Sequence, residues 1–168
     1  MRNFSNKKPK EIKDFYNQFV SSISQRIKSL KDLTKKEEFT YSFEEIKDIE
    51  NFYAKSIKNV SKLNMSKDTL EDIVATYFGT ACRNYLGGKW DVEMDKKVDT
   101  YGHIYVDYYD YEFETGSFFY PYWYTYGLES KQDKVGGISE LIKYFFNLQI
   151  EEQKKIKGYK IKPIKDIN

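Results

Sequence analysis

Four carboxylates near the middle of the chain have the residue type and the spacing to do chemistry. Asp107, Asp110, Glu112 and Glu114 fall within one stretch of eight residues. A pair of carboxylates can perform general acid–base catalysis or bind a divalent cation. Side chains alternate between the two faces of a strand, however, which separates Asp107 from Asp110 and Glu112. The spacing therefore favours a solvated, negatively charged sheet face, with contact to a cationic partner as the alternative.

The other reactive residue types are too few for the common catalytic or metal-binding arrangements. His103 is the only histidine and Cys82 the only cysteine, whereas a zinc site needs three or four converging ligands. We expect a hydrogen-bonded strand histidine and a buried structural thiol in a helix. The chain is thus predicted to be no enzyme, with no catalytic residue, no metal and no cofactor. A single cysteine also excludes an intramolecular disulfide and favours a reducing compartment.

Two glycine pairs have the composition of anion-binding turns. Gly87 and Gly88 follow a predicted helix and lack the Lys-Ser/Thr of a phosphate-binding loop. The segment VGGIS, residues 135–139, precedes a predicted helix, so its amides could face an anion. We favour a flexible turn for that segment.

Aromatic side chains are concentrated in residues 118–126, FFYPYWYTY, which hold seven rings in nine positions. Three interpretations stay open: core strand, protein interface, or a surface that stacks on sugars. Pro121 cannot donate to a sheet, so a strand is expected to end near Tyr120, followed by an irregular stretch. For the core we expect Ile104, Val106, Tyr108, Phe118 and Tyr120, and for a partly exposed face Tyr105, Tyr109, Tyr111 and Phe119.

Charge is segregated along the chain. Residues 68–133 carry 5 Lys and Arg against 13 Asp and Glu, while the segments before and after have net charges of +6 and +4. The aromatic segment therefore lies in the acidic block. An acidic surface repels phosphate backbones, which argues against nucleic acid, and suits a basic protein partner.

Helical periodicity occurs in four places, and a period of two separates the third from the fourth. One helix is expected from Glu11 to about Leu33, and Ser42 to Glu45 has the form of a capping box. Mid-helix Gly79 is expected to let the third helix approach the sheet, with Trp90 filling the seam. The expected elements are helices over about 11–33, 43–57, 69–85 and 138–155, strands near 90–94, 103–113 and 118–120, and a candidate fourth strand at Tyr159 and Ile161.

These elements predict one α+β domain over residues 1–168, with residues 1–10 as a flexible leader. Three N-terminal helices precede a three- to four-stranded antiparallel sheet, and a C-terminal helix packs on that sheet. No apolar run reaches the ~18 residues of a membrane span, and no secretory signal is visible. We expect a soluble cytoplasmic protein that does not bind membranes.

The segment LEDIVATYFGTACRNYLGGKW, residues 70–90, resembles a pattern in small uncharacterised bacterial proteins, some of which look like toxin-immunity proteins. Tyr77, Phe78, Gly79, Gly87, Gly88 and Trp90 carry the resemblance, which extends over about residues 70–121. Thr80 departs from the acidic residue that often follows YFG. The resemblance implies an immunity-type partner protein and brings no catalytic residue.

The sequence therefore favours a non-enzymatic protein that occludes a basic, toxin-like partner with an acidic, aromatic sheet face. The alternative is a glycan- or small-molecule-binding module, or an enzyme, that uses a Tyr/Trp-lined pocket with Asp or Glu. The predicted partner-binding residues are Asp107, Tyr109, Asp110, Tyr111, Glu112, Tyr122, Trp123 and Tyr124.

Overall fold

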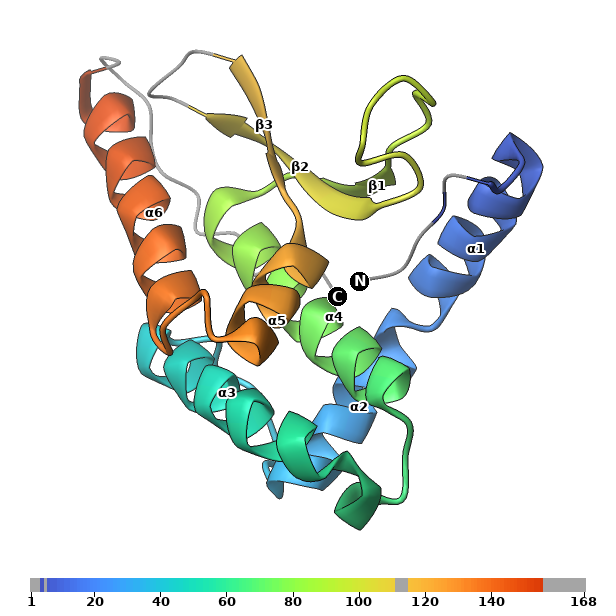
Figure 1. Ribbon diagram of the computed structural model, residues 1–168. Helices are drawn as coiled ribbons and strands as arrows, with labels where there is room; N and C mark the ends of the chain where they lie inside the picture. Colours follow the sequence, from blue (N-terminus) through green and yellow to red (C-terminus); the bar gives the residue numbers. More distant parts are fainter. Residues whose placement is uncertain (1–3, 5, 111–114, 156–168) are drawn as a thin grey trace.

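The computed structural model describes residues 4, 6–110 and 115–155. Over these residues the protein is α+β, with six α-helices, one 3-10 helix (η1) and a three-stranded antiparallel sheet. In Figure 1 the sheet lies above α4 and α5, with α1 on one side and α6 on the other. The elements are α1 (Pro9–Ser21), α2 (Ile23–Thr34), α3 (Phe43–Ser56), η1 (Ile57–Leu63), α4 (Lys67–Leu86), β1 (Lys89–Val92), β2 (Ile104–Asp110), β3 (Thr115–Phe119), α5 (Pro121–Ser130) and α6 (Gly137–Lys155).

The first predicted helix is divided at Ser22, so the expectation of one helix from Glu11 to Leu33 was wrong. The Ser22 hydroxyl donates to the carbonyls of Gln18 (2.8 Å) and Phe19 (2.9 Å), and a serine that bonds to these carbonyls competes with the helical pattern. As a result α1 lies against β1 while α2 packs against α4. Pro9 is the first residue of α1, which removes residues 9 and 10 from the expected leader.

The start of α3 confirms the predicted cap with one change. Ser42 Oγ accepts from the amide of Glu45 at 3.2 Å. The Glu45 carboxylate does not return the bond to Ser42; it accepts from the amide of Tyr41 at 2.7 Å and pairs with Lys36 at 3.1 Å. Glu45 is buried, and these contacts fix the connection between α2 and α3.

The central helix α4 follows its prediction closely. The Ser66 hydroxyl caps its start by accepting from the amide of Thr69 at 3.1 Å, and Gly87, at φ 76°, ends it. A Cβ atom placed on Gly79 would lie under 3.0 Å from three ring atoms of Trp90. The expected close approach of helix and sheet is therefore confirmed, and Cys82 on the same helix is buried as predicted.

The sheet has the order β1-β2-β3, and its inner face packs on the helices. Trp90, Val92, Ile104, Val106 and Phe119 are buried there. Val106 pairs with Phe119 and Asp107 with Phe118, so Phe118 lies on the outer face. The predicted assignment of Phe118 to the core and Phe119 to the exposed face was wrong. Four residues separate Asp110 from Thr115, which puts odd-numbered β3 residues opposite even-numbered β2 residues.

The end of the aromatic segment is a helix and not the irregular stretch that was expected. Pro121 takes the first position of α5, where its missing N–H is no loss and its fixed φ suits the helix. The three following aromatic side chains are consequently about 100° apart around a helix and meet different surroundings.

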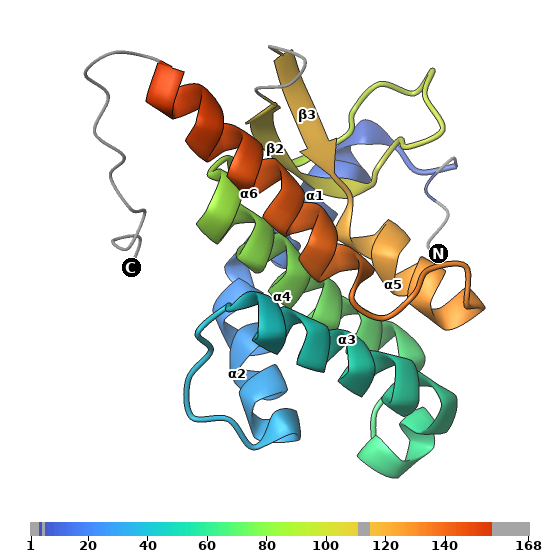
Figure 2. The same cartoon turned by 90° about the vertical axis from the view of Figure 1, so that its left-hand side faces the viewer.

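The final helix α6 begins at Gly137, close to its prediction, and packs against α3 and α4. Figure 2 shows it running alongside α4, above α3. Phe145 of α6 meets Tyr108 of β2 with ring centroids 5.9 Å apart. The candidate fourth strand at Tyr159 and Ile161 lies outside the described residues.

Candidate functional site

Four aromatic side chains form a continuous surface on the outer face of β2 and β3 and at the start of α5. We call Tyr105, Phe118, Tyr120 and Trp123 the outer aromatic face. Tyr105 contacts Phe118 (centroids 4.8 Å apart) and Tyr120 (5.4 Å), and Tyr120 stacks on Trp123 at 4.5 Å. Phe118 is 49% exposed and Trp123 is 45% exposed. Large apolar side chains that touch one another at a surface are typical of an interaction site.

A hydrogen bond holds Trp123 at one end of this face. The Trp123 indole Nε1–H donates to Nδ1 of His103 at 3.2 Å, and the two rings meet edge to face. Because Nδ1 of His103 accepts this bond, the proton of the imidazole is on Nε2 when the bond forms. His103 therefore has a hydrogen bond, as predicted, and it positions an exposed aromatic residue.

Three carboxylates border the outer aromatic face. Asp91 lies opposite Tyr105 in the sheet register, and Asp107 lies opposite Phe118. Burial raises the pKa of the Tyr105 hydroxyl to about 12, and the nearby charges of Asp91, Glu93 and Asp107 add to the rise. Lys89 pairs with Asp91 at 3.4 Å, but its side chain is largely exposed. The face thus combines exposed aromatic rings with a negative border.

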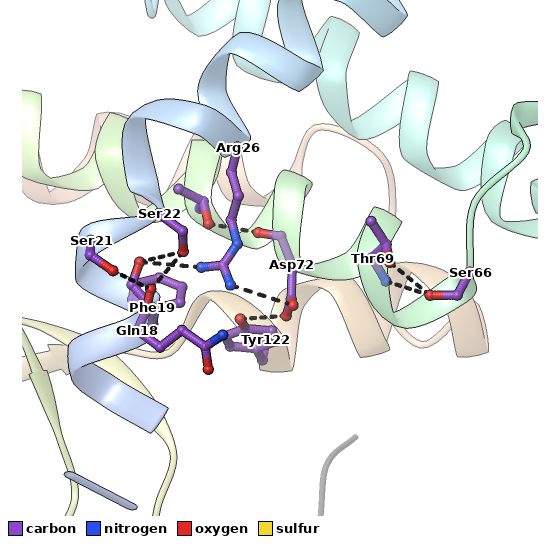
Figure 3. Close-up of polar contacts among 10 residues, drawn as sticks. Gln18, Phe19, Ser21, Ser22, Arg26, Ser66, Thr69, Asp72 and Tyr122 are labelled. Carbon is purple, nitrogen blue, oxygen red and sulfur yellow. Dashed lines mark hydrogen bonds and ion pairs between the residues drawn. The ribbon is translucent and has the colours of Figure 1, made fainter. Parts of the chain in front are cut away.

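A polar cluster beneath α5 fixes the helix that presents Trp123. The Tyr122 hydroxyl donates to Asp72 Oδ1 of α4 at 2.8 Å, and Arg26 of α2 pairs with the other carboxylate oxygen at 3.6 Å. The Arg26 guanidinium also lies over the ring of Phe19, 4.6 Å from its centroid. Figure 3 shows the side chains of Arg26 and Tyr122 converging on Asp72. Three helices are therefore joined through one carboxylate.

The structure brings together only part of the predicted set. Trp123 lies on the outer aromatic face and Asp107 on its border, whereas Tyr122 turns inward to Asp72. Tyr124 stacks on buried Phe119 at 4.8 Å, and burial raises its pKa. Both tyrosines are half-buried, whereas Trp123 is exposed, and their assignment to partner binding stays a prediction. Of the remaining predicted residues, Tyr111 and Glu112 lie outside the described residues, as do the side chains of Tyr109 and Asp110.

Three contributors to the face were missed or placed elsewhere by the sequence. Phe118 and Tyr120 were assigned to the core, and Asp91 was not singled out. The signal for Asp91 was its alternation with buried Trp90 and Val92, because it shares a face with Tyr105 in the next strand. Phe118 could be placed only by knowing the loop length between β2 and β3.

The VGGIS segment does face an anion, although a flexible turn was the favoured prediction. The carboxylate of Glu50, buried in α3, accepts from the amides of Gly136, Ile138 (2.7 Å) and Ser139 (3.1 Å). Burial raises the pKa of Glu50, and the three N–H bonds partly oppose that rise. The anion at the start of α6 is thus a residue of the chain itself.

The described residues contain no cluster of three or more His, Cys, Asp or Glu that could hold a metal ion. No described helix is both long enough and apolar enough to cross a membrane. Burial raises the pKa of the Cys82 thiol far above its usual range, which makes it a poor nucleophile. In comparisons with known proteins, no family model, no curated protein and no solved structure matches the chain.

Proposed function

We propose that the protein is a non-enzymatic binding protein that engages a basic protein partner through the outer aromatic face. The observation that carries the proposal is the row of touching rings from Phe118 to Trp123, exposed at both ends and bordered by three carboxylates. Tyr and Trp are the usual anchors of protein interfaces, because they bury a large area with little loss of side-chain freedom.

Rigid presentation supports a binding role for Trp123. Its ring is held by the stack on Tyr120 and by the bond to His103, and its helix is held through Tyr122 and Asp72. A side chain that is already ordered loses less conformational entropy on binding. Trp123 is therefore suited to be the central anchor.

The negative border determines which partner fits. Asp91, Glu93 and Asp107 would attract a cationic surface during encounter and pair with Lys or Arg at the rim. A partner that carries its positive charge around an apolar patch matches this arrangement. Nucleic acid does not, since its phosphates would meet the same carboxylates.

We further propose that the partner is a toxin and that the protein acts by steric occlusion in the cytoplasm, as an immunity-type protein. This part rests on the resemblance carried by residues 70–90, together with the acidic, aromatic surface. Within it, Gly79 and Trp90 are structural, because they form the contact between α4 and the sheet. The resemblance therefore concerns residues that stabilise the fold, and we expect the outer aromatic face to bind the partner.

The test is affinity capture followed by a binding measurement on matched variants. The full chain is immobilised, proteins bound from an extract of its own cells are identified, and their affinities are measured by calorimetry. Trp123→Ala is expected to lower the affinity for the specific partner at least about 30-fold, the loss typical of a central anchor. Asp107→Lys is expected to slow association and to reduce its dependence on salt.

Tyr144→Ala is the matched control, since Tyr144 is an aromatic residue on α6 with an exposed fraction of 49%, equal to that of Phe118. The proposal fails if Trp123→Ala and Tyr144→Ala retain the same partners with the same affinity. The glycan-binding alternative is favoured if the affinity capture yields no protein partner and the wild type binds an oligosaccharide panel that Trp123→Ala does not bind.

A further inference from the structure

The two edges of the sheet differ in how they are protected. At the β1 edge, the Tyr16 hydroxyl of α1 donates to the carbonyl of Trp90 at 2.7 Å, and the strand carries charged Lys89 and Asp91. Side-chain caps and charges of this kind prevent edge-to-edge pairing. The β3 edge has the sequence TGSFF, without charge or proline. Figure 2 looks from the β3 side, with α1 on the far side of the sheet.

The alternation of the ladder shows which β3 groups point outward. Glu93 directly follows β1 and His103 directly precedes β2, and they continue the register in which Asp91 faces Tyr105. The amide of Glu93 donates to the carbonyl of His103 at 3.0 Å, so odd-numbered residues of the two strands bond to each other. The even-numbered residues of β2 then bond to β3, where their register partners are Thr115, Ser117 and Phe119. The capped carbonyl of Trp90, an even-numbered residue, points outward as this phase requires.

Gly116 and Phe118 therefore direct their N–H and C=O groups away from β2. No residue that the structure describes forms a hydrogen bond with these four groups. Donors and acceptors that have no partner among the described residues, on an edge without charged side chains, form a template for another strand.

We propose that a second copy of the chain pairs with this edge, β3 against β3, antiparallel about a two-fold axis at Ser117. Gly116 then lies opposite Phe118 of the partner subunit, and Phe118 opposite Gly116 of the partner subunit. Both are hydrogen-bonding positions, so each pair exchanges two bonds and all four groups of each edge are satisfied. The result is a continuous six-stranded sheet, and this inference does not depend on the proposed function.

The side chains fit the same axis. A Cβ atom on Gly116 would meet nothing nearer than Asp107 Oδ1 at 3.8 Å, and the residue is not in the left-handed region. The monomer therefore does not require glycine at this position. In the pair, the half-exposed ring of Phe118 covers the glycine of the facing strand, a combination that stabilises edge glycines.

Charge does not prevent the pairing. Asp107 lies one strand inward from the edge, so it and its copy are separated by three strand spacings, or about 14 Å. That distance exceeds the screening length of about 8 Å in physiological salt. Because the β3 edge carries no charge and pairs with its own copy in register, a second copy of the chain fits this edge better than a charged strand of another protein.

The first test is sedimentation velocity on the full chain from about 1 μM to about 1 mM, a range that covers small interfaces. The wild type is expected to shift from monomer to dimer. Gly116→Pro removes one outward N–H from each copy without removing a bond to β2, and should weaken dimerisation at least about tenfold. Gly116→Ala keeps the N–H and should retain the dimer. A wild type that stays monomeric throughout, or a Gly116→Pro variant that dimerises equally, overturns the proposal.

The second test locates the axis by disulfide trapping. Ser117 and its copy form a non-hydrogen-bonded pair with Cα atoms about 4.5 Å apart, within disulfide range. Ser117→Cys should form a covalent dimer under mild oxidation, while Cys82 is buried and does not interfere. Ser130→Cys, at an exposed serine on α5, is the control for random collision. Equal cross-linking of the two variants would place the contact elsewhere.

Discussion

Gly79→Ala should destabilise the protein, although the same change in an ordinary helix stabilises it. Gly79 lies in the interior of α4, where alanine is favoured over glycine by about 1 kcal/mol. Here the added Cβ would lie under 3.0 Å from three ring atoms of Trp90. The ring is 6% exposed, and Phe19 packs against it with centroids 5.0 Å apart. It cannot move aside without disturbing the contact between α1 and the sheet.

The two effects can be weighed. Overpacking of this kind costs about 1–3 kcal/mol, and the gain in helix propensity offsets about 1 kcal/mol. The difference between the two ranges is a fall of about 0–2 kcal/mol in the free energy of unfolding. We expect the upper half of that range, about 1–2 kcal/mol, because three ring atoms must move at once. Equilibrium unfolding in urea, followed by circular dichroism, measures this directly, and an unchanged slope would show that the unfolded state is unaffected.

Gly137→Ala is the matched control because a Cβ there meets nothing within 4 Å at the first residue of α6. It should be neutral or slightly stabilising. In a Trp90→Phe background, which leaves room, Gly79→Ala should cost less by at least about 0.5 kcal/mol. A Gly79→Ala variant as stable as Gly137→Ala would refute the proposed close contact between α4 and the sheet.

Three further outcomes are expected. Burial raises the pKa of Glu50 above 4.5 in the folded state, so the folded protein binds this proton more tightly than the unfolded chain. The contribution of Glu50 to the free energy of unfolding should therefore decrease as pH rises above about 4.5. Urea unfolding of Glu50→Gln across pH 4–7 should lack that decrease. Tyr122→Phe removes a hydrogen bond to the Asp72 carboxylate and should lower the melting temperature by about 3–6 °C, the equivalent of roughly 1.5 kcal/mol, whereas an unchanged melting temperature would show that the bond contributes nothing. Cys82 should resist thiol reagents in the folded protein and react fully in urea; rapid labelling without denaturant would contradict its burial.

The sequence predicted best where local chemistry and long-range packing agree. Ser42 caps α3 as expected, and Gly87 ends α4 directly after the predicted helix, because caps depend on residues within one turn. The contact of Gly79 with Trp90 was also foreseeable, since a mid-helix glycine before a strand tryptophan needs a packing reason.

The misses share a different cause: each depends on a choice that neighbouring residues do not determine. The periodicity of residues 11–33 fits one helix; the break at Ser22 combines the hydroxyl bonds of that residue with the packing of α1 on β1 and of α2 on α4, and the long-range part cannot be read from neighbouring residues. The faces of Phe118 and Phe119 depend on whether the preceding loop has an odd or even number of residues. Pro121 is equally compatible with a strand end and a helix start, and the contacts of Tyr122 with Asp72 and of Tyr124 with Phe119 favour the helix.

The tie between Glu50 and the start of α6 has a consequence for synthesis on the ribosome. Glu50 is translated 86 residues before its first amide donor, Gly136. Until that donor emerges, the Glu50 carboxylate lacks its amide donors and accepts hydrogen bonds from water instead. A hydrated carboxylate cannot be buried, so α3 does not reach its final packing while the chain is incomplete. We therefore expect nascent chains that stop before α6 to keep Glu50 hydrated and α3 loosely docked, and the last helix to complete the fold.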